Sequence, residues 1–307
     1  MSTFRNRLFQ SIYAPTYKIV GASDAVAGDV CMYDSNNEKM ILVHGEFKEM
    51  HFPMHLYTPI GVVVVPGNHE VYGKDTCSVV SLVNMSCTTP SSGTLNEDTM
   101  AFGPQTDLST YNYTTVIIKD DGVMKGNGFG YLSKNGVYNS TTLKIPDPYT
   151  EDMGRNPDYY DVKVAVTNAM SDFAGASNTT VIVKTRGTKN YSSWIPTYNT
   201  ATDYPAASCC NMFYTVGTEQ GDWYLPAAGE WGYITSKWDQ INNAITMLNK
   251  NYGEQFTTVK NNSSYWTSSE YSGKNARYVH TDNGMGHTLK TGTNKVRAFL
   301  KVKTQIA

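Results

Sequence analysis

Histidines at a metal-ligand spacing are the first residues in this sequence whose types and positions could do chemistry. His51 and His55 are four residues apart, which would place both imidazoles on one face of a helix, as in paired zinc ligands. Pro53 lies between them and disfavours a helix, because proline lacks an amide donor and clashes with the preceding turn. His44, His69 and Glu70 are close in sequence, so an incidental or intersubunit metal site stays open. Packed or solvated histidines are the alternative.

Nucleophilic chemistry has few residues to use. The chain has five cysteines: Cys31, Cys77, Cys87, Cys209 and Cys210. They show no Cys-x-x-Cys spacing and their number is odd, so we expect them to be reduced and mostly buried. The sequence contains no glycine-rich phosphate loop and no nucleophile elbow. It therefore predicts a protein that is not an enzyme and that binds no cofactor.

The C-terminal stretch TSSEYSGKNARYVHTDNGMGH is the candidate binding surface. Flat side chains there, on which sugar rings or partner side chains can stack, are Trp266, Tyr271, Tyr278 and His280. Hydrogen-bond donors and acceptors are supplied by Ser268, Ser269, Glu270, Asn275, Arg277 and Asp282. Oligomer packing competes with ligand recognition for this surface, and Trp266 and Tyr278 fit a core position as well as a contact position.

One amphipathic helix is the clearest element that could position these residues. Large apolar side chains recur at helical spacing at Trp231, Ile234, Trp238, Ile241, Ile245 and Leu248. Two tryptophans on one stripe need a large surface to cover them, so we expect this helix to lie across a sheet. A shorter helix is predicted over 203–214, with Pro205 in its first turn.

Strands are predicted both before and after these helices along the chain. The apolar run 58–66 lacks alternation, which indicates burial on both faces, and 78–85 resembles it. A hairpin is predicted from 27–34 and 39–43. After Gly253, strands are predicted at 264–268, 276–281, 286–290 and 295–302, with Asp282-Asn283-Gly284 as a type I′ hairpin signal.

The organisation predicted along the chain has two parts. Residues 1–56 form an N-terminal attachment or oligomerisation region, because their β unit is too short for a core of its own. Residues 57–307 form the main domain. Within it, residues from about 86 to 160 are rich in Gly, Asn, Thr and Tyr, with short strand candidates at 114–119 and 141–145. This composition predicts a surface insertion.

Composition narrows the class of partner. The net charge is −2, and 25 Lys and Arg are scattered without a basic patch, so we expect no nucleic-acid partner. No apolar run reaches the length of a membrane span, and the N-terminus lacks the apolar stretch of a signal peptide, so the chain is expected to fold in a cytoplasm without membrane insertion. Twenty-two tyrosines among many small polar residues are typical of adhesive, virion and extracellular proteins.

Four C-terminal motifs occur in an order that resembles the C-type-lectin-like domains of bacteria and their phages. They are DWYLPAAGEW, YWTSSEYS, NARYVHTDNG and VRAFLKV. PIGVVVVPG at 59–67 and DFAGASNTTVI at 172–182 also resemble parts of that group, so the resemblance covers roughly 57–307. It implies an α+β, C-type-lectin-like fold: two helices packed on twisted antiparallel sheets, with a small N-terminal β region and a β-rich insertion. Trp223, Leu225 and Pro226 are then structural.

The resemblance also bears on function. The calcium-binding motifs of animal lectins are absent, and no cysteine follows Cys210, which opposes the chemistry of the formylglycine-generating enzymes of this fold. The resemblance implies a phage virion protein, a head fibre or tail-associated fibre located on the virion. Its expected partners are other virion proteins at the N-terminal region, a host-surface glycan or protein, and copies of itself, with a trimer favoured. The alternative is a bacterial lectin-like surface or adhesion protein.

Overall fold

The structure is a computed structural model of the 307-residue chain. It describes residues 17–45, 56–67, 72, 75–88, 95–96, 99–105, 172–186, 197–198, 203–234, 237–253, 256–259, 262–271, 274–281 and 284–304. The strand candidates at 114–119 and 141–145, and nearly all of the expected insertion, lie outside this part of the chain.

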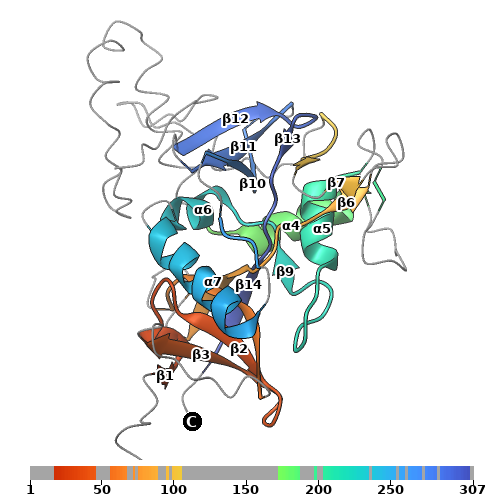
Figure 1. Ribbon diagram of the computed structural model, residues 1–307. Coiled ribbons are helices and arrows are strands. Elements are labelled where there is room, and N and C mark those ends of the chain that lie inside the picture. The colour runs from red at the N-terminus through yellow and green to blue at the C-terminus, as the bar shows by residue number, and fades with distance from the viewer. Residues whose placement is uncertain are drawn as a thin grey trace, which may run out of the picture.

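A seven-stranded antiparallel sheet runs through the molecule (Figure 1). Its strand order is β1-β3-β2-β4-β5-β14-β9. The bounds are β1 Tyr17–Val20, β2 Val30–Asp34, β3 Lys39–Gly45, β4 Tyr57–Val65, β5 Thr76–Ser81, β9 Trp223–Tyr224 and β14 Phe299–Lys303, with the short 3-10 helix η1 at Ala22–Asp24. The strand predicted at 58–66 is therefore confirmed, and residues 60–65 are buried on both faces.

The predicted N-terminal hairpin is also present. Asp34 pairs with Lys39, and the Asp34 carboxylate accepts hydrogen bonds from the backbone amides of Asn36 and Asn37 across the turn. Strand β2 pairs with β4 as well as with β3, so 17–45 contributes to the same sheet as 57–81. Among the described residues, the expected division at 56 does not separate two sheets.

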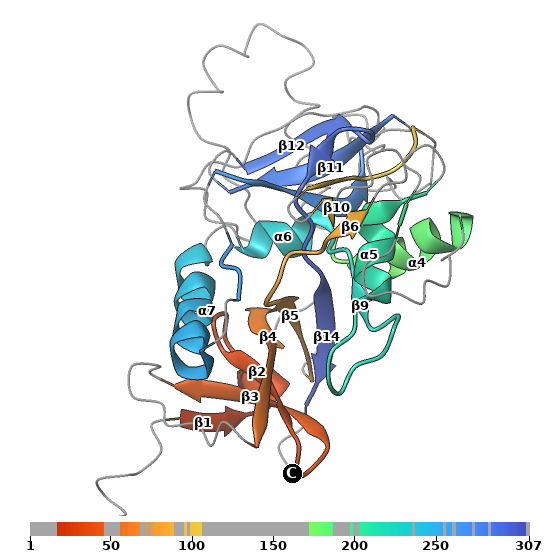
Figure 2. The same cartoon turned by 45° about the vertical axis from the view of Figure 1, so that its right-hand side comes forward.

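Two helices cover one face of this sheet, α6 (Ala228–Ile234) and α7 (Trp238–Tyr252) (Figures 1 and 2). All six residues of the predicted apolar stripe are buried. The prediction of one continuous helix was wrong, because the backbone of Lys237 leaves helical dihedral angles at φ −128°.

The opposite face packs against α4 (Gly175–Arg186) and α5 (Pro205–Met212). Helix α5 confirms the predicted short helix, with Pro205 in its first turn. Alternate residues of the strands separate the two cores: Val62 points to the α6–α7 side, whereas Val63 points to the α4–α5 side.

A second, three-stranded antiparallel sheet comprises β10 (Ser264–Glu270), β11 (Asn275–His280) and β12 (Gly284–Leu289). It lies above α6 in Figures 1 and 2. Two strand pairs of two residues each complete the fold, β13 (Thr293–Asn294) with β8 (Met100–Ala101) and β6 (Cys87–Thr88) with β7 (Leu95–Asn96). The described chain is thus a mixed α+β protein with mostly antiparallel sheets.

Trp231 joins the two sheets at the centre of the core. Its ring centroid lies 4.8 Å from that of Tyr265 in the small sheet and 5.3 Å from that of Phe299 in the large one. Its indole nitrogen donates to the carbonyl of Trp266 at 3.1 Å. Through these contacts one side chain of α6 packs against both sheets.

The last predicted strand, 295–302, is divided between the two sheets. Lys295 forms a bridge with Tyr265 of β10, and only the segment from Phe299 onward pairs with β5. Between them, the buried guanidinium of Arg297 binds the carbonyl of Thr257 and the Asn84 side chain, the latter at 3.0 Å. The strand is interrupted because this segment crosses from one sheet to the other.

Candidate functional site

The small sheet carries most of the residues predicted to bind a ligand. In its hairpin, His280 pairs with Gly284 and Arg277 with His287. Gly284 has φ 83°, a left-handed conformation that glycine adopts without strain. The hairpin between β11 and β12 is confirmed, but three residues connect the paired positions, whereas the Asn-Gly type I′ signal predicted two.

The predicted site residues divide into two groups. Five are buried, so their side chains do not form an exposed contact surface: Trp266, Ser268, Ser269, Glu270 and Arg277. Four are partly exposed: Tyr271, Asn275, Tyr278 and His280. Asp282 lies outside the described residues.

Trp266 is a core residue because both its ring and its nitrogen have partners inside. Its Nε1 donates to the Met100 carbonyl at 2.7 Å, and its ring meets Phe102 edge-on at 5.7 Å between centroids. Tyr278 pairs with Trp266 across the strands and packs over Gly286, where an added Cβ would lie 2.6 Å from the tyrosine ring. This face of the small sheet is therefore part of the α4–α5 core.

Ser268 and Ser269 belong to a buried polar network. The Ser269 hydroxyl donates to the Asp172 carboxylate at 2.6 Å and accepts from the Ala228 amide at 3.0 Å. The Asn178 amide donates to Asp172 at 3.0 Å and to Ser268 at 3.3 Å. Burial raises the pKa of Asp172, and these hydrogen bonds partly oppose the rise. The network joins α4, α6 and β10, so both serines have a structural role.

Glu270 forms a buried ion pair with Lys290. Both side chains are 0% exposed, and Lys290 Nζ also lies 5.7 Å from the centroid of the Phe102 ring. The lysine follows β12 and the glutamate ends β10, so the pair holds together the two ends of the small sheet. Neither side chain reaches the surface.

The opposite face of the small sheet is partly exposed to solvent at the end that holds Tyr271, Asn275 and Leu289. Tyr271 and His287 stack with ring centroids 3.8 Å apart and planes 5° from parallel. The Arg277 guanidinium carbon lies 5.2 Å from the Tyr271 ring centroid. Beyond them on the same face are Asn275 and its cross-strand partner Leu289, which is 47% exposed. We call Tyr271, Asn275, His287 and Leu289 the aromatic platform.

The buried Arg277 guanidinium is the charged group beside the platform. Burial lowers the pKa of Arg277 to about 10, so the guanidinium is still charged at neutral pH. Burial, together with the Arg277 charge, lowers the pKa of His287 to about 4. The imidazole is therefore neutral near pH 7, and its Nδ1 atom is buried. The platform combines flat rings, an amide and an apolar side chain, the groups that stack against and hydrogen-bond a polar ring such as a sugar.

The residue types in the sequence did not identify His287 and Leu289 as candidate binding residues. The signal that could have found them is the hairpin register, since a three-residue connection places His287 opposite Arg277 and Leu289 opposite Asn275. A two-residue Asn-Gly turn would have placed Lys290 opposite Arg277, so the signal depends on knowing the length of the connection.

Helix α6 carries one carboxyl group, that of Glu230, and it is extensively hydrogen-bonded. It accepts from the Ala227 amide at 2.7 Å and from the Tyr224 hydroxyl at 2.9 Å, and it also contacts the Tyr72 hydroxyl. Burial raises its pKa to about 7, although the hydrogen bonds and Lys301 oppose the rise. A carboxyl with such a pKa could exchange protons, but it is 0% exposed and fixes the start of α6 against the large sheet.

Of the four histidines considered for a metal site, His44 lies within the described residues. Its Nδ1 lies 2.7 Å from the Asp29 carboxylate. His51, His55 and His69 lie outside the described residues. Within the part of the chain that the structure describes, no cluster of three or more His, Cys, Asp or Glu side chains is arranged to hold a metal ion. No described helix is both long and apolar enough to cross a membrane.

Comparison with known proteins gives little beyond this geometry. No protein-family model matches the chain, and no curated protein matches it. Among solved structures, the chain is similar to a fimbrial protein from Bacteroides ovatus ATCC 8483, with 16% sequence identity and a TM-score of 0.49. The match covers 91% of this chain and 49% of the fimbrial protein, so the chain spans about half its length. At this identity and TM-score the likeness carries no argument about function.

Proposed function

We propose that this chain is a non-catalytic, adhesion-type binding protein that recognises its ligand through the aromatic platform. The observation that carries the proposal is the stacked Tyr271–His287 pair beside Arg277 at the solvent end of the small sheet. Rigid aromatic rings bind with a small loss of conformational entropy, because few rotatable bonds are immobilised.

The ligand class follows from the platform's groups. A sugar ring presents C–H groups that stack on an aromatic ring and hydroxyls that hydrogen-bond to amides and imidazoles. Asn275 supplies an amide, the Tyr271–His287 pair supplies flat rings, and Leu289 adds apolar contact at the edge. A glycan on a cell surface is therefore the ligand that we propose.

For the fold and setting, we propose a C-type-lectin-like domain carried on a phage virion as a head or tail-associated fibre. Support comes from the motif order and from the burial of the first motif: Trp223 and Leu225 lie in the α4–α5 core, and Glu230 is buried on α6. Residues 1–56 would attach the chain to other virion proteins or join copies, with a trimer favoured. Many copies would give avidity from weak individual sites.

A glycan panel tests the binding function. The full chain is labelled and applied to immobilised bacterial surface glycans, beside the variants Tyr271→Ala and Tyr214→Ala. Tyr214 is 56% exposed and follows α5, away from the platform, which makes it a matched control. We expect selective binding that Tyr271→Ala abolishes and Tyr214→Ala retains. Equal binding by both variants contradicts the proposed site.

Gold labelling of intact phage particles with an antibody to this chain tests the setting. Label at the tail tip indicates a receptor-binding protein, and label around the capsid indicates a head fibre. Particles without label contradict the virion proposal and favour the alternative, a bacterial lectin-like surface protein.

A further inference from the structure

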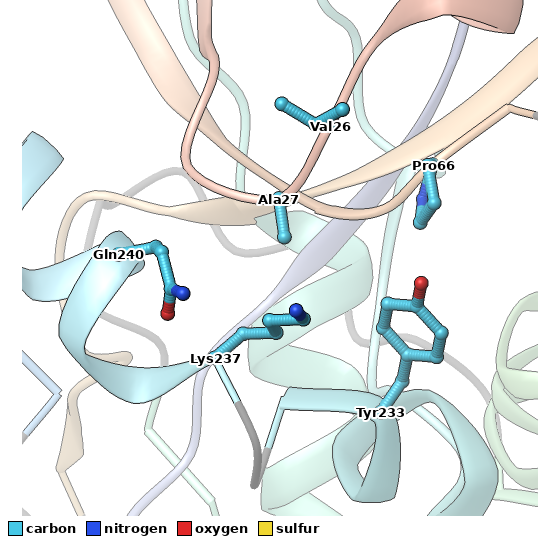
Figure 3. Close-up of a pocket in the computed structure, with 6 residues that line it drawn as sticks. All are labelled: Val26, Ala27, Pro66, Tyr233, Lys237 and Gln240. Carbon is cyan, nitrogen blue, oxygen red and sulfur yellow. The ribbon is translucent and has the colours of Figure 1, made fainter. Parts of the chain in front are cut away.

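A pocket on the other side of α6 has the form of a second binding site. It has a volume of about 260 Å³. It is lined by Val26, Ala27, Pro66, Tyr233, Lys237 and Gln240 (Figure 3). These residues come from the loop before β2, the end of β4, α6 and the start of α7, and none belongs to the small sheet that carries the platform.

The loop before β2, which carries Val26 and Ala27, forms the roof of the pocket and is fixed in place by its own hydrogen bonds. The Asp29 carboxylate accepts the Val26 amide at 2.8 Å, and the Gly28 amide donates to the Val63 carbonyl at 2.9 Å. Gly28 has φ 99°, and an added Cβ there would lie 3.1 Å from the Gln240 Cβ. The loop therefore packs closely on α7, and little ordering remains to oppose binding.

The opposite wall is polar. Figure 3 shows the Lys237 side chain extending between Gln240 and Tyr233, while the Tyr233 hydroxyl points toward Pro66. Among the described residues, no carboxylate lies within ion-pair distance of the Lys237 ammonium; Asp29, on the roof, contacts His44 instead. The pocket thus presents one positive charge, a hydroxyl and an amide opposite three apolar side chains.

We infer that this pocket binds a hexuronic acid, the acidic form of a monosaccharide. Its carboxylate complements the Lys237 charge, and its hydroxyls complement Tyr233 and Gln240. Its C–H face complements Val26, Ala27 and Pro66. A free amino acid is disfavoured, because its ammonium group would lie near Lys237. The volume is just below the roughly 300–1,000 Å³ of drug-sized ligand sites, which suits a single small ring.

The test is a ligand-observed NMR titration of the full chain with glucuronate, with glucose as the neutral comparison. The variant Lys237→Met keeps most of the apolar stem and removes the charge. Lys237 makes no side-chain cap to α7, so the helix is expected to persist, which circular dichroism checks. Lys250→Met, in the last turn of α7, is the matched control.

Saturable glucuronate binding that weakens about tenfold or more in Lys237→Met, is retained in Lys250→Met and exceeds glucose binding supports the inference. Equal binding of glucose and glucuronate overturns it, as does an unchanged affinity in Lys237→Met or an absence of saturable binding. The titration is repeated with Tyr271→Ala, and loss of binding there instead would place the sugar on the platform and also overturn the pocket.

Discussion

Glu230 makes the stability of this protein depend on pH in a direction that the structure fixes. In the unfolded chain its carboxyl ionises near pH 4.5, whereas in the folded protein burial raises its pKa to about 7. Between these pH values the folded state holds a proton that unfolding releases. The contribution of Glu230 to the free energy of unfolding therefore falls by about 1.4 kcal/mol per pH unit as the pH rises through this window.

The size of the effect follows from the two pKa values. Their difference is about 2.5 units, so the contribution of Glu230 is fully present below pH 4.5 and is lost above pH 7, a decrease of about 3 kcal/mol. Burial also raises the pKa values of Asp29 and Asp172, which adds loss of the same sign. The lowered pKa of His287 acts in the opposite direction, because between about pH 4 and 6.5 the unfolded chain binds a proton that the folded protein does not. A Glu230 variant is needed to separate its share.

The variant Glu230→Gln mimics the protonated carboxyl, since an amide can accept from the Ala227 amide and donate to the tyrosine hydroxyls. Urea unfolding from pH 4.5 to 8 measures the result. We expect wild type and variant to have similar stability at pH 4.5, and the variant to be more stable by about 3 kcal/mol at pH 8. Glu219→Gln, at an exposed site, is the control. Parallel pH profiles for wild type and Glu230→Gln would refute the reasoning.

Two further substitutions probe the packing, and equilibrium urea unfolding measures both. Lys290→Met leaves the buried Glu270 carboxylate without its lysine and is expected to cost about 3–5 kcal/mol, most of which the double variant with Glu270→Leu recovers. A loss below about 1 kcal/mol for the single variant contradicts a buried ion pair. Gly61→Ala places a Cβ 2.6 Å from the Val80 carbonyl oxygen in the centre of the large sheet and is expected to cost about 1–3 kcal/mol. A neutral outcome would mean that β4 and β5 separate more easily than their register indicates.

Local patterns in the sequence predicted most of the elements. The unbroken apolar run of β4, the hairpin of β2 and β3, and the tryptophan stripe each depend on residues close together in the chain, and each was confirmed as a strand, a hairpin or a buried face. The break between α6 and α7 was missed, because a periodic stripe stays in phase across a short interruption.

The candidate site was less predictable because its burial depends on distant residues. Glu270 and Ser269 look like surface groups until Lys290 and Asp172 are placed beside them, 20 and 97 residues away. Arg277 likewise lies on the predicted strand, but its burial depends on what covers the sheet. Tyr271 and Asn275 were found from residue type alone, whereas His287 and Leu289 required the strand register.

Whether the aromatic platform binds a glycan is measured most directly by the affinity of the full chain for the glycan that it binds best on the panel. Base–aromatic stacking offers a scale of about 1–3 kcal/mol for a polar ring on a side chain. We therefore expect Tyr271→Ala to lower the affinity by about five- to 150-fold, while Tyr214→Ala leaves it unchanged, with both variants as stable as wild type to within about 1 kcal/mol. An affinity for Tyr271→Ala equal to that of wild type, in a correctly folded variant, would show that the glycan does not bind at the platform.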